Sequence, residues 1–190
     1  MFPDFLDRDA DTAARGLLGC RLVRRLNGRC ISVRIVETEA YDQLDPASHT
    51  YRGMSERNRA MFGPAGHAYI YLVYGMHLCL NITAGSDGFG AGVLIRAAEP
   101  ADDESADAIL ARYSDGRPVR LCLNGPGKLT RALGIGMDLY GHDLQEPDLQ
   151  LETGRLLPGE TILATARIGV ARAKERLRRY IIDGNLYCSR

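Results

Sequence analysis

The sequence contains no tryptophan, no apolar run of 18 residues and no pair of cysteines in a CxxC spacing. The missing apolar run excludes a transmembrane helix and so a membrane partner. The chain does not start with a basic segment followed by an apolar one, so we expect no secretory signal. Its five cysteines are odd in number and irregularly spaced. They predict reduced, mostly buried thiols in a cytoplasmic protein rather than a disulfide framework or a zinc ribbon.

The 190 residues, of which 45% are apolar, predict a single domain over residues 1–190. A chain of this size buries roughly 70% of its unfolded surface, so it needs neither a metal nor a disulfide to fold. Its 24 basic and 24 acidic side chains give a formal net charge of zero. That balance excludes a strongly basic tail binder and a disordered acidic chain. Taken alone, it also argues against a nucleic-acid partner.

Hairpin signals dominate the first half of the chain. Residues 20–26 and 29–41 flank Asn27-Gly28, which is a strong signal for a two-residue turn. Residues 68–73 and 77–83 flank Tyr74-Gly75, and residues 91–98 form another apolar strand. The pattern predicts a mostly antiparallel sheet.

Helix signals are fewer and lie around these strands. Asp9 can cap a helix that ends near Gly19, and a second helix follows the acidic residues after Pro100. A third should run from Gly125 to Gly134, and residues 161–189 should combine a basic helical stretch with a strand at 180–182. The predicted fold class is therefore mixed α/β (α+β): one domain built on a curved, mostly antiparallel sheet with peripheral helices.

Two acids lie in an otherwise apolar strand. In an ideal strand Glu37, Glu39 and Tyr41 point to one face. The pattern alone favours a solvent-exposed strand face, because buried carboxylates are costly. The functional alternative is an acid or base beside an aromatic ring, as in glycosidases.

Aromatic and basic residues supply the other candidates. Tyr69 and Tyr71 share a strand face, and Tyr74 at a turn tip should project outward as a wedge or contact residue. A solvated or core role is the plainer interpretation of these tyrosines. Arg96 in an apolar strand needs a partner, for which Glu39 or a phosphate would serve. His77 and Cys79 make only half a metal site, so no metal is expected.

Four basic side chains, three in a long loop and one at a helix start, are candidates for contacts with anions. The long polar segment 42–64 carries Arg52, Arg57 and Arg59, which are either solvated charges or phosphate ligands. Lys128 follows Gly125-Pro126-Gly127 at a helix start, a plausible phosphate seat although the P-loop pattern is missing.

Five motifs then occur together in one order: RIVETEAY at 34–41, RNR at 57–59, YIYLVYGM at 69–76 followed by Asn81, LIRA at 94–97 and GPGK at 125–128. With them the chain closely resembles the alkyladenine (3-methyladenine) DNA glycosylase family of vertebrates and many bacteria, which is distinct from the helix-hairpin-helix glycosylases. The resemblance runs from the first helix to Ser189.

The resemblance implies a monofunctional, monomeric base-excision enzyme without metal, cofactor or lyase step. Its expected partner is double-stranded DNA that contains damaged purines. Expected substrates are 3-methyladenine and 7-methylguanine, with hypoxanthine and ethenoadenine as further candidates. The product would be an abasic site.

The resemblance also implies roles for residues. Glu39 matches the general base that activates the attacking water. Arg96 matches the arginine that helps to position this water, and the backbone at 167–170 resembles a segment that lines the water site. Tyr74 matches the residue that fills the gap left by the flipped base, with Met76 beside it. The expected base pocket comprises Tyr41, His49, Tyr71, Asn81 and Leu94. The expected DNA-backbone contacts are Arg52, Arg57, Arg59, Lys128 and Arg167.

Physical chemistry fits this scheme. A base must leave the stack before its glycosidic bond is reachable, and aromatic stacking returns roughly 1–3 kcal/mol per base. A cationic base such as 3-methyladenine is a good leaving group and is attracted to tyrosine faces.

Two alternative functions remain. One is an inactive binder of damaged DNA, and the other is a carbohydrate hydrolase that uses Glu37 and Glu39.

The zero net charge then takes another meaning. Residues 99–107 and 138–152 hold acids and no Lys or Arg. The remaining segments carry the basic excess, which predicts a dipolar molecule with a basic DNA face and an acidic back.

Overall fold

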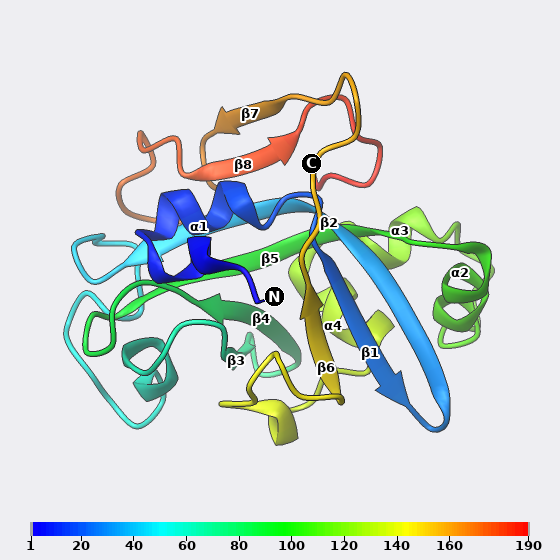
Figure 1. The fold of residues 1–190 in the computed structure, drawn as a ribbon, viewed down its shortest axis with the longest axis horizontal. Helices are drawn as coiled ribbons and strands as arrows, with labels where there is room; N and C mark the ends of the chain where they lie inside the picture. Colours follow the sequence, from blue (N-terminus) through cyan, green and yellow to red (C-terminus); the bar gives the residue numbers. More distant parts are fainter. Residues whose placement is uncertain (1, 190) are drawn as a thin grey trace.

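One curved antiparallel sheet organises the chain in the computed structural model, which describes residues 2–189 (Figure 1). Six strands follow the order β3-β4-β5-β2-β1-β6, and β8 joins β2 and carries β7. The strands are β1 (Arg21–Leu26), β2 (Arg29–Asp42), β3 (Ala68–Val73), β4 (His77–Thr83), β5 (Ala91–Pro100), β6 (Leu149–Glu152), β7 (Ile162–Thr165) and β8 (Arg179–Ile182). The mixed α/β class with a curved antiparallel sheet is confirmed.

The helices lie around this sheet. They are α1 (Ala10–Gly16), α2 (Asp103–Leu110), α3 (Arg120–Leu123) and α4 (Pro126–Leu133), with 3₁₀ turns η1 (Asp4–Asp7), η2 (Arg59–Phe62) and η3 (Met137–Leu139). As predicted, the Asp9 side chain caps α1 by accepting from the N–H groups of Asp11 and Thr12. Gly134 ends α4 in the left-handed region. Within residues 2–189, no helix combines the length and apolar character that crossing a bilayer requires.

Both predicted hairpins form with the expected turn chemistry. Asn27 and Gly28 have φ of 51° and 75°, and Tyr74 and Gly75 have φ of 52° and 70°. Left-handed residues at both central positions match the twist of antiparallel strands. Gly75 adopts this conformation freely, whereas Tyr74 is a bulky residue held in it.

Strand β2 is the axis of the sheet. It pairs with β5 along most of its length, with β1 near its start and with β8 at residues 37–39. Its pairing with β5 shifts register on both sides of Glu37. Such irregularities bend a strand and re-aim its side chains. The bend lies immediately before Glu39.

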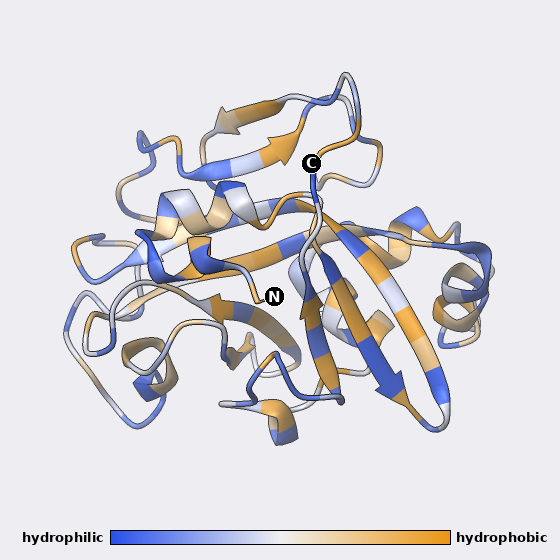
Figure 2. Cartoon of the chain, viewed as in Figure 1, coloured by the Kyte–Doolittle hydropathy of each residue, from blue (hydrophilic) through white to orange (hydrophobic). Residues whose placement is uncertain are grey.

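Apolar side chains from both sheet and helices form the core. Figure 2 shows β5 largely hydrophobic, whereas β1 and β2 contain both hydrophobic and hydrophilic residues. Val33, Ile35, Val93 and Ile95 are fully buried, and α1 and α4 pack against the strands with their buried alanines and leucines. The sheet is thus rigidly supported where it presents the candidate residues.

The predicted basic helix between β7 and β8 is wrong. Residues 166–178 are irregular, and Gly169 and Ala173 take φ of 76° and 49°. Two arginines of this segment, Arg167 and Arg178, are buried and paired with Asp45. Contacts with a distant carboxylate therefore override the local helix preference of the segment.

Candidate active site

A cavity of about 480 Å³ opens where β2, β5, β4 and β3 run side by side. Glu39, Leu94, Asn81 and Tyr69 stand directly opposite one another across these four strands. Residues in such register point to one face of a sheet. All four line the cavity, so the strand ladder itself assembles the site.

Glu39 is fully buried yet borders the cavity. Its Oε1 accepts the backbone N–H of Ile168 at 2.8 Å, and its Oε2 accepts the Tyr41 hydroxyl at 2.7 Å. Arg96 Nη1 lies 3.3 Å from Oε2. The expectation of an exposed strand face is therefore wrong for Glu39, and the contact with residue 168 agrees with the segment expected beside the water site.

Arg96 lies in β5 at the irregularity where Ala97 pairs with Glu37 and Ile95 pairs with Thr38, and its side chain lines the cavity. Its Nε donates to Glu37 at 2.9 Å, so it contacts both acids of the motif. Burial alone would lower the pKa of its guanidinium, but the carboxylates of Glu39 and Glu37 outweigh this and raise the pKa. Arg96 therefore stays cationic.

Aromatic rings form the cavity walls. The Tyr41 hydroxyl is bonded to Glu39, and burial, with a smaller contribution from the Glu39 charge, raises the pKa of this phenol. His49 Nδ1 lies 2.9 Å from the Tyr69 hydroxyl, and its ring meets the edge of Tyr71 at 4.5 Å between centroids. Partial burial, then the charge of Arg57, lowers the pKa of His49, so its imidazole is neutral at pH 7.

The remaining pocket residues lie together as the pattern predicts. Asn81 is buried, and its side-chain amide donates to the Tyr69 carbonyl at 3.2 Å. Leu94 is buried between Glu39 and Asn81 in the strand register. Cys79, beside Tyr71, also lines the cavity, and burial raises the pKa of its thiol.

The turn between β3 and β4 stands at the cavity rim. Tyr74 lines the cavity and has 87% of its surface exposed, and Met76 is 71% exposed. The Tyr74 backbone has φ of 52°, a conformation that bulky residues rarely adopt and that clusters at functional sites. The geometry suits a residue that enters another molecule.

The structure corrects the expected role of Arg167. Its side chain is completely buried and pairs with both carboxylate oxygens of Asp45. It also donates to the Ala40 carbonyl and lies 4.7 Å from the centre of the Tyr41 ring. A side chain with no exposed surface cannot contact a phosphate, so Arg167 supports the cavity wall instead.

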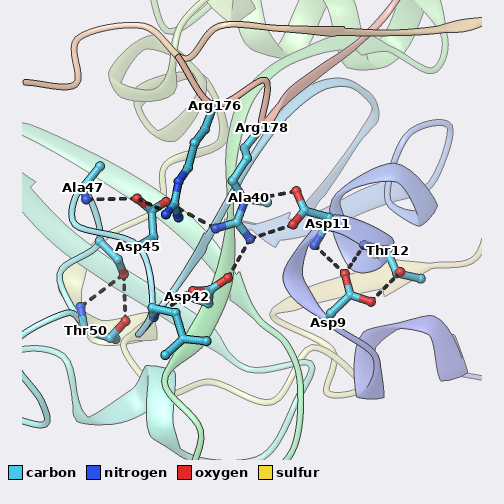
Figure 3. A network of polar contacts seen from close by, with 12 residues as sticks. Asp9, Asp11, Thr12, Ala40, Asp42, Asp45, Ala47, Thr50, Arg176 and Arg178 are labelled. Carbon is cyan, nitrogen blue, oxygen red and sulfur yellow. Dashed lines mark hydrogen bonds and ion pairs between the residues drawn. The ribbon is translucent and has the colours of Figure 1, made fainter. Parts of the chain in front are cut away.

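Asp45 is the centre of a larger ionic cluster. Figure 3 shows Arg178 between Asp11, Asp42 and Asp45, which links α1, the end of β2 and the segment before β8. Asp45 Oδ1 also accepts the N–H of Ala47. The cluster therefore fixes both walls of the cavity, residues 46–49 and 168–172.

The other expected phosphate ligands are exposed, as such contacts require. Arg57 donates to the Leu72 carbonyl at 3.3 Å, beside the wedge turn, and Arg59 pairs loosely with Glu56. Arg52 and Lys128 are exposed, and Lys128 Nζ bonds the Asn124 side chain. Among residues 2–189, no three metal-type ligands gather in one place, His77 and Cys79 included.

Several residues of the site escaped sequence reasoning. Asp45 and Ser189 belong to none of the sequence motifs. Glu37 was noticed, but its burial was not expected. The one available signal was the unusual density of acids and arginines around two apolar strands.

Comparison with known proteins agrees with the motif order. The family model described as methylpurine-DNA glycosylase (MPG) matches residues 4–186. A Methanoculleus marisnigri protein named "Putative 3-methyladenine DNA glycosylase" is 46% identical over 98% of this chain and 96% of its own length. A Carboxydothermus hydrogenoformans protein of the same name is 44% identical over the same shares. One from Rubrobacter xylanophilus is 48% identical over 88% of this chain and 86% of its own. The chain therefore belongs to the methylpurine-DNA glycosylase family.

Proposed function

We propose that this protein is a DNA glycosylase that removes alkylated purines, 3-methyladenine above all, from duplex DNA. One observation carries the proposal: a buried carboxylate, Glu39, lies at the inner end of an aromatic cavity whose rim bears an exposed tyrosine. Family membership supports the glycosylase role, and the names of the relatives support the substrate class.

Glu39 acts as the general base. A water bound beside it gives a proton to the carboxylate and attacks C1′ of the flipped nucleotide. The C1′–N bond breaks, and its electron pair leaves with the purine. The departure of a cationic base produces a neutral one, so no acid is needed on the leaving group. The carboxylate also stabilises the oxocarbenium character of the transition state.

The cavity selects the base by stacking and by shape. Tyr41 and Tyr71 offer ring faces and edges to a cationic purine, whose attraction to them adds to stacking. Asn81 opposes the 2-amino group of normal guanine, which lacks the positive charge that attracts 7-methylguanine to the tyrosine rings. Hypoxanthine and ethenoadenine, which lack that group, are the further substrates of this proposal.

Tyr74 supports extrusion of the nucleotide. Its exposed ring on the β3–β4 turn enters the minor groove and occupies the gap in the stack, and Met76 contacts the neighbouring bases. Such an insertion offsets part of the unstacking cost. Arg52, Arg57, Arg59 and Lys128 hold the phosphates on either side.

The reaction ends at the abasic site. Strand cleavage by a glycosylase needs an amine nucleophile, and the described residues that line the cavity include neither of the chain's two lysines, Lys128 and Lys174. This favours a monofunctional hydrolase without a lyase step. We place its action in the cytoplasm, as a monomer.

Release of free base tests the proposal. The protein is incubated with N-methylated duplex DNA, and 3-methyladenine and 7-methylguanine are separated from the polymer and quantified; a hypoxanthine duplex is the second substrate. Glu39→Gln should excise at least about 100-fold more slowly, the size of a general-base contribution. Strands should break only after alkali treatment.

Glu99→Gln provides the control, because it makes the same change in a paired acid outside the cavity. A wild-type protein that binds lesion DNA without releasing base would instead establish the inactive-binder alternative. Release at an undiminished rate by Glu39→Gln would refute the general-base role.

A further inference from the structure

Glu37 is a second buried carboxylate for which the proposed reaction has no use. It lies two residues before Glu39, has no exposed surface and does not belong to the described residues that line the cavity. Its Oε1 accepts from Arg96 Nε at 2.9 Å and from Arg179 Nε at 2.6 Å. A glycosidase-type second acid would have to reach the substrate, so this geometry argues against that role.

Ser189 completes the surroundings of Glu37. Its hydroxyl donates to Oε1 at 2.7 Å and its backbone N–H to Oε2 at 2.5 Å. Arg179 Nη2 in turn donates to the Ser189 carbonyl at 2.7 Å. Four donors, two of them guanidinium groups, therefore hold the Glu37 side chain in a fixed position.

This arrangement determines where Arg96 points. Its Nε is bound to Glu37, and Nε and Nη2 lie 3.4 and 3.3 Å from the Ser189 hydroxyl. Only Nη1 is directed to Glu39, at 3.3 Å. The flexible arginine is thus anchored on one edge of its guanidinium, and Glu39 receives the longer, weaker contact.

Removal of Glu37, which anchors Arg96, would change the hydrogen bonding of the general base Glu39. Without Glu37, the strongest remaining partner for the guanidinium in this buried place is Glu39. A planar guanidinium pairs best with a carboxylate through two parallel hydrogen bonds. Such a pair would occupy the oxygens of Glu39 that the attacking water needs, and it would withdraw Arg96 from the position that it holds in the cavity.

The geometry points to Glu37, together with Arg179 and Ser189, as a positioning site that anchors Arg96 and keeps Glu39 free to act as the base. The inference rests on the proposed function, since it concerns the same reaction. It assigns a catalytic consequence to residues that do not contact the substrate, and it makes Ser189, 150 residues beyond Glu39 in the chain, part of the active-site structure.

The test is the single-turnover rate of 3-methyladenine release by Glu37→Gln, measured with enzyme in excess. We expect a fall of about 30-fold, comparable to the loss of other supporting contacts around a reactive group. Affinity for lesion duplex, which depends on the walls and the wedge, should change less than about twofold. Glu99→Gln, whose partner Arg34 keeps Glu160, is the matched control and should excise normally.

A double-mutant cycle separates positioning from a general structural defect. If Glu37 acts through Arg96, then Glu37→Gln should have little further effect on the rate in an Arg96→Ala background. An equal fall in both backgrounds would overturn the inference, as would a wild-type rate for Glu37→Gln.

Ser189→Ala keeps the experiment decisive if Glu37→Gln fails to fold. It removes the hydroxyl but leaves the backbone N–H on Glu37, at a partly exposed position. We expect a fall of about threefold to tenfold in the rate with unchanged melting temperature. An unchanged rate would refute the positioning site, whereas wild-type protein that releases no base would refute the proposed function instead.

Discussion

Loss of the Asp45 charge should strongly destabilise the protein, because Asp45 anchors the segments that form the cavity walls. Asp45 has no exposed surface, and it pairs with the fully buried Arg167 and with Arg178. Asp45→Asn keeps the shape but leaves the buried Arg167 without its anion and removes one of the three anions around Arg178. Breaking a buried pair in this way costs ~3–5 kcal/mol.

The retained amide oxygen of Asn can still accept one hydrogen bond, and Arg178 keeps Asp11 and Asp42. We therefore expect a loss near the lower limit, about 3 kcal/mol of unfolding free energy. For a chain of this length each kcal/mol lowers the melting temperature by ~2–4 °C, so a decrease of about 6–12 °C should result.

The effect should depend on pH in a defined direction. Burial alone would raise the pKa of the Asp45 carboxyl, but the hydrogen bonds and charge of Arg167 outweigh it and hold the pKa below the ordinary 3.8. A carboxyl with a lowered pKa stabilises the fold above its unfolded pKa and loses that contribution as the pH falls through the folded one. The gap between wild type and Asp45→Asn should be full at neutral pH and shrink below about pH 4.

Urea unfolding followed by circular dichroism measures these differences, with Glu56→Gln as the control. Glu56 forms an exposed ion pair with Arg59, so its loss should leave the midpoint unchanged. A destabilisation by Asp45→Asn below about 1 kcal/mol at pH 7 would refute the reasoning, because it would mean that Arg167 is hydrated rather than buried.

Three further expectations concern the wedge, a helix cap and the DNA face. Tyr74→Ala should weaken binding to lesion duplex about tenfold, the value of one stacked ring, without changing the melting temperature, because the side chain is 87% exposed; unchanged affinity in a fluorescence titration would contradict the wedge. Asp9→Ala should cost about 1 kcal/mol in urea unfolding, since it removes the cap bonds of α1; equal stability would contradict that cap. Arg52→Gln should reduce the slope of log affinity against log salt by about 0.9; an unaltered slope would mean that Arg52 contacts no phosphate.

Local signals explain what the sequence predicted correctly. Asn27, Gly28 and Gly75 favour the left-handed conformations of their turns, and Asp9 specifies the start of α1 by its side-chain oxygen. Asn81 and Leu94 were expected in the pocket from the family resemblance, and the register of β2, β5 and β4 places them beside Glu39. The turns and the helix cap depend on residues close in sequence, and the strands follow the rule that alternate side chains point to the same face.

Long-range ion pairs explain most of what it missed. Arg167 and Asp45 are 122 residues apart, and nothing around either residue indicates the other. An arginine in a basic segment therefore suggested a helix and a phosphate contact, and both predictions were wrong. Burial of Glu37 and Glu39 likewise depends on Arg96 and Arg179, which come from other strands.

These internal pairs also change what the zero net charge means for DNA binding. The basic stretch near the C-terminus was one of the segments expected to carry the basic excess, but Arg167 and Arg178 are buried against acids and Arg179 pairs with Glu37. Because each internal cluster contains both signs, the clusters contribute little net field outside the protein. Any asymmetry of charge on the molecular surface must therefore come from exposed segments. In Figure 1 the acidic helix α2 lies at one end of the long axis, and the segment between β2 and η2, with its exposed arginines, lies at the other. Charge placement rather than total charge can therefore orient the cavity toward a polyanion.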